Sequence, residues 1–166
     1  MQICKWANDW AENWKCVFHS QIMLANKMKV VIDTNVLLES ISSRSPCHWF
    51  YKAITEKKVD VYLTTEILHE YEEKIEEHWS LEVARAVVRT LTKLSSVHLI
   101  NTYFRLQLIT KDAADNKFTD CAFAADADYL ITNDRHFDIL KTINFPKINA
   151  LRLEEFEPLL NENKEK

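Results

Sequence analysis

The chain has 166 residues, an apolar fraction of 47%, a charged fraction of 28% and a formal net charge of −4. This is the composition of an ordinary globular protein of one domain, long enough to bury roughly two thirds of its unfolded surface. The negative charge excludes a global positive field for nucleic acid, so any such contact must come from a local basic patch, a bound cation or a partner.

The first 27 residues differ from the rest of the sequence. Trp6, Trp10 and Trp14 recur every four residues, which on a helix would form one aromatic stripe. Three interpretations stay open: an upstream start codon assigned in error, an extension that packs on the domain or forms a dimer arm, and a helix that binds a partner or a membrane surface. The expected organisation is an N-terminal extension at 1–27, one domain at 28–160 and a charged tail at 161–166.

From Met28 onward, strand-like and helix-like stretches alternate. Short runs rich in β-branched and aromatic residues predict strands at 30–32, 59–63, 97–100, 129–132 and 147–151. Apolar residues at helical spacing, preceded by capping residues, predict helices at 35–42, 46–57, 65–75, 81–94, 115–125 and 153–160. This alternation without tight hairpin turns predicts an α/β fold with a mainly parallel central sheet flanked by helices on both faces.

Several simple classes of protein are excluded by what the sequence lacks. Glycine is absent, which excludes the glycine-rich loops that bind dinucleotides and nucleoside triphosphates. The four cysteines show neither a CxxC pair nor the Cys/His spacing of a zinc site, so we expect them to be reduced. The sequence shows neither a secretory signal nor a long apolar stretch, and we expect a cytoplasmic protein without a membrane partner.

Acidic residues follow two of the predicted strands. Asp33 ends the run VVID and Asp134 follows YLITN, so both carboxylates would lie at the carboxyl edge of a parallel sheet, where such sheets bind ligands. Carboxylates gathered there repel one another unless a cation joins them. A set of oxygen ligands suits Mg²⁺ or Mn²⁺ rather than zinc, and these ions usually act on phosphates in enzymes. The pattern therefore predicts a metal-dependent phosphodiesterase.

Three segments together resemble the PIN domain family, specifically its bacterial and archaeal ribonuclease toxins. They are MKVVIDTNVLLES, EILHEYEEKI and DNKFTDCAFAADADYLITNDRHF, in this order. The resemblance implies a PIN-like fold, cleavage of RNA, a Mg²⁺ or Mn²⁺ cofactor, a cognate antitoxin and a homodimer. Two alternatives stay open: a PIN-type nuclease of RNA processing or decay that has no antitoxin, and a catalytically silent PIN fold that serves as a binding module.

The resemblance also assigns candidate site residues. Four acids match the acidic positions of the family and would hold one or two metal ions for hydrolysis: Asp33, Glu70, Asp115 and Asp134. Asp120 is a further candidate for metal contact, although on an ideal helix it lies about 140° away from Asp115. Glu66, one helical turn before Glu70, is the alternative second acid. The candidate substrate contacts are Thr34, Asn35, Lys117, Thr132, Asn133 and Arg135.

Simpler structural explanations exist for many of these acids. Asp33 and Asp115 stand where an aspartate commonly caps a helix, and Glu73 is expected to belong to a solvated helical face. Asp112 is expected to be a loop or capping residue, and His136 a surface group that could contact an RNA phosphate.

Overall fold

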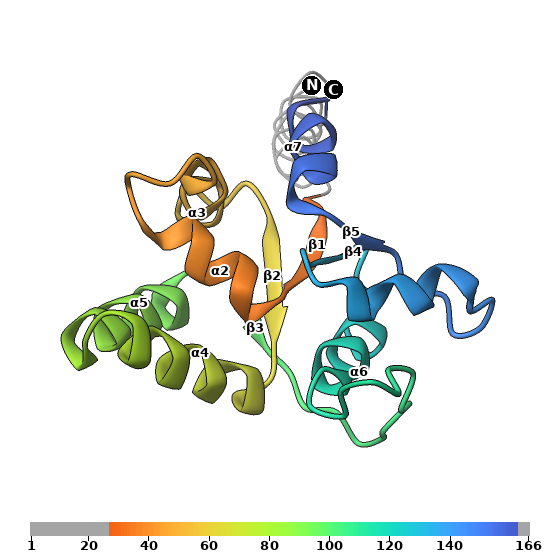
Figure 1. The fold of residues 1–166 in the computed structure, drawn as a ribbon. Coiled ribbons are helices and arrows are strands. Elements are labelled where there is room, and N and C mark those ends of the chain that lie inside the picture. Colours follow the sequence, from red (N-terminus) through yellow and green to blue (C-terminus); the bar gives the residue numbers. More distant parts are fainter. Residues whose placement is uncertain (1–26, 163–166) are drawn as a thin grey trace, which may run out of the picture.

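Five parallel strands form the centre of the computed structural model, which describes residues 27–162 (Figure 1). The strands are β1 (Lys29–Ile32), β2 (Asp60–Leu63), β3 (Val97–Leu99), β4 (Tyr129–Ile131) and β5 (Ala150–Leu151). They pair in the order β3-β2-β1-β4-β5, and each neighbouring pair is parallel. The predicted α/β class with a parallel sheet is therefore confirmed. The tryptophan stripe in the predicted N-terminal extension lies outside the described residues.

The strand order places a topological switch point between β1 and β4. The chain builds the sheet outward from β1 through β2 to β3, and then returns to the other side of β1 to form β4 and β5. The helical connections from neighbouring strands diverge at such a point, so the carboxyl edge stays open for a ligand. The ends of β1 and β4 are therefore the first place to look for a functional site.

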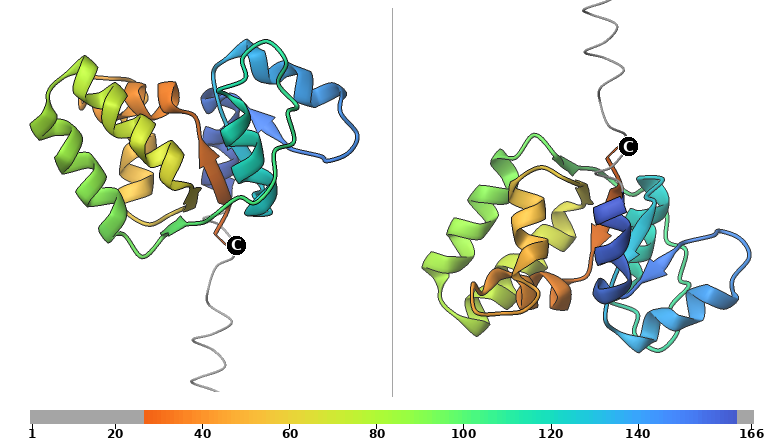
Figure 2. Two further views of the ribbon diagram at one scale, coloured as in Figure 1. Left: turned by 90° about the horizontal axis from the view of Figure 1, so that it is seen from below. Right: turned by 90° about the horizontal axis from the view of Figure 1, so that it is seen from above.

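Helices cover the sheet on both sides. In the described residues they are α2 (Thr34–Ile41), α3 (His48–Thr55), α4 (Thr65–His78), α5 (Leu81–Lys93), α6 (Asn116–Ala124), the 3-10 helix η1 (Arg135–Thr142) and α7 (Leu153–Glu162). Helices α2 to α5 lie to one side of the strands and α6 with η1 to the other (Figures 1 and 2). Helix α7 packs through Phe156, whose ring contacts Phe50 of α3 and Tyr129 of β4.

The core explains why the central strands read as continuous apolar runs. Val30, Val31 and Ile32 of β1 are each at most 1% exposed, because helices cover both faces of that strand. The helices that flank them begin where a side chain satisfies a free backbone N–H. The Thr64 hydroxyl accepts the backbone N–H of Ile67 at the start of α4.

One local prediction was wrong, and one helix was not predicted. The predicted helix start at Pro46 is a turn, and α3 begins two residues later, because the Ser45 hydroxyl accepts the backbone N–H of Cys47 instead of capping a helix that includes Pro46. Helix η1 was not predicted, since its short 3-10 turns leave little apolar periodicity.

Candidate metal centre

Asp33 is held at the switch point by both central strands. Its backbone N–H donates to the carbonyl of Ile131 at the end of β4, and its side chain is 4% exposed. One carboxylate oxygen accepts the backbone N–H of Asn35 at 3.4 Å, which caps α2, and the other accepts the hydroxyl of Thr132 at 2.8 Å. The expected helix cap is therefore present, and the same carboxylate also lies at the open edge of the sheet.

Asp134 is brought to the same edge through Thr132. The Thr132 hydroxyl accepts the backbone N–H of Asp134 at 3.0 Å while it donates to Asp33. The Asp134 carboxylate in turn accepts the N–H of His136 at 2.8 Å and caps η1. One hydroxyl thus fixes the path of the chain that carries the second acid past the first.

Glu70 reaches the centre from α4. The neighbouring Tyr71 is fully buried and its hydroxyl donates to the carbonyl of Ile32 at 2.5 Å, which docks α4 against the end of β1. The hydroxyl of Thr34 donates to Glu70 Oε1 at 2.5 Å, and the ammonium of Lys117 forms an ion pair with Oε2. Between the two glutamates left open by the sequence, it is Glu70 that contacts the start of α2, where Asp33 is the cap.

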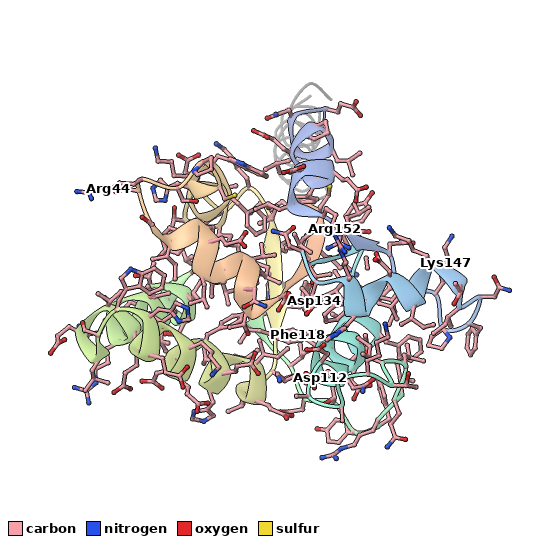
Figure 3. All side chains as sticks on the ribbon, viewed as in Figure 1. Arg44, Asp112, Phe118, Asp134, Lys147 and Arg152 are labelled. Carbon is pink, nitrogen blue, oxygen red and sulfur yellow. The ribbon has the colours of Figure 1, made fainter. Side chains whose placement is uncertain are left out.

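Asp115 and His136 complete the cluster from α6 and η1. His136 Nδ1 lies 3.4 Å from Asp115 Oδ2 and 3.6 Å from Asp134 Oδ2. Ligand atoms of Asp112, Asp115 and His136 lie within 4.8 Å of one another, a spacing that could hold a metal ion. Figure 3 shows Asp112 and Asp134 in the region where α2, α4 and α6 meet.

Two members of this cluster were not assigned to the metal by the sequence. Asp112 does cap its loop as expected, since it accepts the N–H of Ala114 at 2.9 Å, but it also lies next to Asp115. His136 is partly buried rather than free on the surface. The only signal in the sequence that His136 could join the cluster was its position two residues after Asp134, because Asp115 lies 21 residues away in the chain.

The electrostatics of the cluster favour a bound cation. Burial raises the pKa of the Asp33 carboxyl from 3.8 to about 6, with a further contribution from the negative charges of Asp115 and Asp134, against the hydrogen bonds from Thr132 and Asn35. The pKa of Asp115 is also raised, first by burial and then by Asp112. Within residues 27–162 no lysine or arginine forms an ion pair with Asp33. Carboxylate oxygens are the ligands that a hard divalent cation prefers. Within residues 27–162, however, the ligand atoms that lie within 4.8 Å of one another are those of Asp112, Asp115 and His136, and not those of Asp33 or Glu70.

The remaining predicted residues lie at the border of this centre. Asp120 lies in an adjacent cleft, where it accepts the N–H of Leu106 at 2.8 Å and faces Glu66, so its contact with metal stays a prediction. Asn133 donates to Glu39 and accepts the N–H of Leu153. Arg135 is exposed.

An α/β fold with acids gathered at its switch point defines the general class, and comparison with known proteins gives the family. A family model described as PIN domain matches residues 29–136, and the chain belongs to this family. Its members are generally nucleases. The uncharacterized protein MJ1680 of Methanocaldococcus jannaschii is 30% identical over 154 residues, which cover 81% of this chain and 96% of that protein.

Solved structures share the fold at low sequence identity. The structure of VapBC2 from Rickettsia felis, bound to a DNA fragment from their promoter, matches with a TM-score of 0.53 and 16% identity, over 75% of this chain and 98% of that chain. PAE2754 from Pyrobaculum aerophilum matches with a TM-score of 0.51 and 15% identity, over 86% and 98% of the two chains. In the described part of this chain, none of the helices is both long and apolar enough to cross a membrane.

Proposed function

We propose that this protein is a Mg²⁺- or Mn²⁺-dependent endoribonuclease and the toxin of a toxin–antitoxin pair. The observation that carries the proposal is the buried Asp33 carboxylate at the switch point, with Asp115 and Asp134 as its charged neighbours. Burial and the nearby charges of Asp115 and Asp134 raise the pKa of Asp33, and a bound cation would stabilise its ionised form. A nuclease of the PIN family has a use for that cation, since its substrate is a phosphodiester.

Asp33, Glu70, Asp115 and Asp134 are the residues that would hold the ion, largely through water because Mg²⁺ gives up its hydration shell reluctantly. When bound, the ion would polarise the phosphodiester and lower the pKa of a coordinated water. Thr132 and Thr34 fix the orientation of Asp33 and Glu70 by their hydrogen bonds. The chain itself positions these oxygens before substrate arrives.

Phosphate would be attracted by two features beside the acids. The first turn of α2 begins directly after Asp33, and a helix N-terminus favours an anion. The Lys117 ammonium already lies at the site through its ion pair with Glu70, and it supplies a positive charge for a phosphate oxygen. These local charges offset the negative net charge of the chain.

The toxin role rests on a further step. The three sequence segments that identify the family match its ribonuclease toxins, and the fold is shared with VapBC2, a toxin–antitoxin complex. A cognate antitoxin and a homodimer are therefore part of the proposal. A PIN-type nuclease of RNA processing or decay is the alternative.

The deciding experiment is RNA cleavage by the purified full chain. We expect cleavage of single-stranded RNA with Mg²⁺ or Mn²⁺, none with EDTA, and none from the Asp33→Asn variant in either ion. Absence of cleavage by the wild type over a range of RNAs would overturn the nuclease and leave a binding module.

The toxin role needs a separate test in cells. Expression of the wild type should arrest growth, expression of Asp33→Asn should not, and a short reading frame next to the gene should restore growth when co-expressed. An active nuclease that leaves growth unaffected would favour RNA processing instead. Sedimentation of the purified chain tests the homodimer.

A further inference from the structure

A second feature of the molecule lies next to the metal centre and shares Lys117 with it. It is a cleft of about 840 Å³ between the start of α4, the start of α6 and the irregular segment 100–114 that joins β3 to α6. We call it the Tyr103 cleft, and the residues on which the argument depends are Glu66, Tyr103, Phe104, Arg105, Lys117 and Asp120. Its volume is within the usual range of ligand sites.

Lys117 links the Tyr103 cleft to the metal centre. This side chain lines the cleft and at the same time forms the ion pair with Glu70. Only 10% of the Lys117 side chain is exposed, so its position between the two features is fixed by packing. A ligand that fills the cleft would therefore approach the candidate ligands of the metal.

The rings in this cleft are exposed in an unusual way. Tyr103 is 90% exposed and the adjacent Phe104 is 38% exposed, the latter with its edge against Phe123. Exposed aromatic rings side by side in the chain cost free energy in water, and a partner that covers them removes this cost. A free planar face on Tyr103 is what a stacking ligand requires.

The segment that carries Tyr103 is anchored to α6. The Asp120 carboxylate accepts the backbone N–H of Leu106 at 2.8 Å, and the Asn116 side chain bonds both the N–H and the carbonyl of Ile109, at 2.9 and 2.8 Å. The anchored residues face inward while Tyr103 and Arg105 face solvent. Asp120 thus has a clear positioning role, which is to hold this segment against α6.

We propose that the Tyr103 cleft binds the single-stranded part of an RNA substrate, with one base stacked on the Tyr103 ring and with Arg105 and Lys117 against the adjacent phosphates. This inference rests on the proposed nuclease function and names its substrate class. Stacking of a base on an aromatic ring does not depend on a positive surface charge, so an acidic protein can use it to bind RNA. A duplex is excluded from the platform, since its bases are already stacked on each other.

The first test measures binding without cleavage. A fluorescent single-stranded RNA is titrated with the full chain in EDTA, and the anisotropy gives the dissociation constant. Tyr103→Ala should bind about tenfold more weakly. Tyr103→Trp keeps a stacking face and should bind like the wild type. The matched control is Phe145→Ala, because Phe145 is 84% exposed in the segment after η1, outside the cleft. A duplex of the same sequence should not distinguish Tyr103→Ala from the wild type.

The second test measures the phosphate contact. Arg105→Gln should lower the slope of log affinity against log salt by about 0.7, the value for one phosphate of a single strand. Arg44→Gln is the control, since Arg44 is exposed between α2 and α3 and far from Asp112 in Figure 3. Equal melting temperatures of all variants would show that the fold is intact.

The outcomes separate this inference from the nuclease proposal. Equal binding of single-stranded RNA by wild type and Tyr103→Ala, or no binding by the wild type, would overturn the platform even if the protein cleaves RNA. Tyr103-dependent binding by a protein that never cleaves with Mg²⁺ or Mn²⁺ would overturn the nuclease and retain the platform.

Discussion

The Thr132 hydroxyl donates a hydrogen bond of 2.8 Å to Asp33, although the two residues lie 99 positions apart in the chain. The contact follows from the register of the sheet, in which Ile32 of β1 pairs with Ile131 of β4. Asp33 and Thr132 are the next residues after this pair, so both emerge at the carboxyl edge. The hydrogen bond orients the carboxylate and lowers its pKa against the burial that raises it.

Asp33→Asn should remove stabilisation by metal. For the wild type, binding of Mg²⁺ or Mn²⁺ to the folded form alone should raise the free energy of unfolding by about 2.7 kcal/mol at a hundredfold excess over the dissociation constant. The amide of the variant keeps the shape but not the charge, so its melting temperature should respond little to either ion, and RNA cleavage should be abolished. Thermal unfolding with and without metal measures the first effect. A full metal response in the variant would place the ion elsewhere.

The stability of the metal-free protein should fall as pH rises through the Asp33 pKa. Asp33 has a pKa of about 6 when folded and 3.8 as the ordinary value, so between these values the folded form keeps a proton that the unfolded chain has lost. The contribution of Asp33 to the free energy of unfolding is complete below pH 3.8 and is lost as the pH rises to about 6. The free energy of unfolding changes by about 3 kcal/mol at most over this range. Asp115 and Asp120 act in the same direction.

The measurement is urea unfolding in EDTA between pH 4 and 8, for the wild type and Asp33→Asn. The difference between the two curves isolates Asp33 from the other acids. We expect the variant to be the more stable of the two above pH 6 and to lose that advantage toward pH 4. With saturating Mg²⁺ the order above pH 6 should reverse, because metal competes with the proton. Parallel curves for the two proteins in EDTA would contradict the raised pKa.

The edge of the sheet was predictable from sequence for a physical reason. A strand buried on both faces reads as an uninterrupted β-branched run, so the ends of β1 and β4 are visible, and parallel strands bring those ends together. Asp33, Thr132 and Asp134 could therefore be predicted as neighbours. The α/β class follows from the same alternation of elements.

Contacts made by irregular backbone could not be predicted in this way. Phe104, Leu106 and Leu108 alternate with polar residues, a pattern typical of a strand, but the segment forms no strand. The sequence therefore gives no signal for the anchor between Asp120 and Leu106 or for the exposure of Tyr103. His136 meets Asp115 only because η1 and α6 begin near the same point. Asp120 was a candidate for metal contact despite its spacing from Asp115, and nothing local indicated the backbone N–H that it accepts.

Thr34→Val should show whether the orientation of the Glu70 carboxylate matters for cleavage, because it keeps Glu70 and removes the hydroxyl that orients it. Thr34 is 4% exposed, and its hydroxyl donates to Glu70. Loss of this hydroxyl should lower the free energy of unfolding by about 1 kcal/mol and slow cleavage. Thr34→Ser keeps the donor and should retain most cleavage. The check is the cleavage rate at saturating metal for both variants. Equal rates would mean that this hydrogen bond does not position Glu70 for the reaction.

Glu70→Gln should resolve which glutamate of α4 serves the metal centre. Glu66 and Glu70 lie one turn apart, but Glu70 contacts Thr34 and Lys117, whereas Glu66 lines the Tyr103 cleft with Asp120. We expect Glu70→Gln to lose most of the rise in melting temperature with Mn²⁺ and to cleave RNA about 100-fold more slowly. In EDTA the free energy of unfolding of Glu70→Gln should be about 1 kcal/mol lower than that of the wild type, because Lys117 loses its ion pair with Glu70.

The matched variants for this test are Glu66→Gln and Glu73→Gln. Glu73 is exposed on the same helix, so its change should leave both the Mn²⁺ response and cleavage as in the wild type. Glu66→Gln should also keep the full Mn²⁺ response, since its carboxylate faces the Tyr103 cleft rather than Asp33. Its removal takes one negative charge from the path proposed for RNA, and binding of single-stranded RNA in EDTA should become slightly tighter. Loss of the Mn²⁺ response in Glu66→Gln and not in Glu70→Gln would move the second acid of the metal centre one turn along α4.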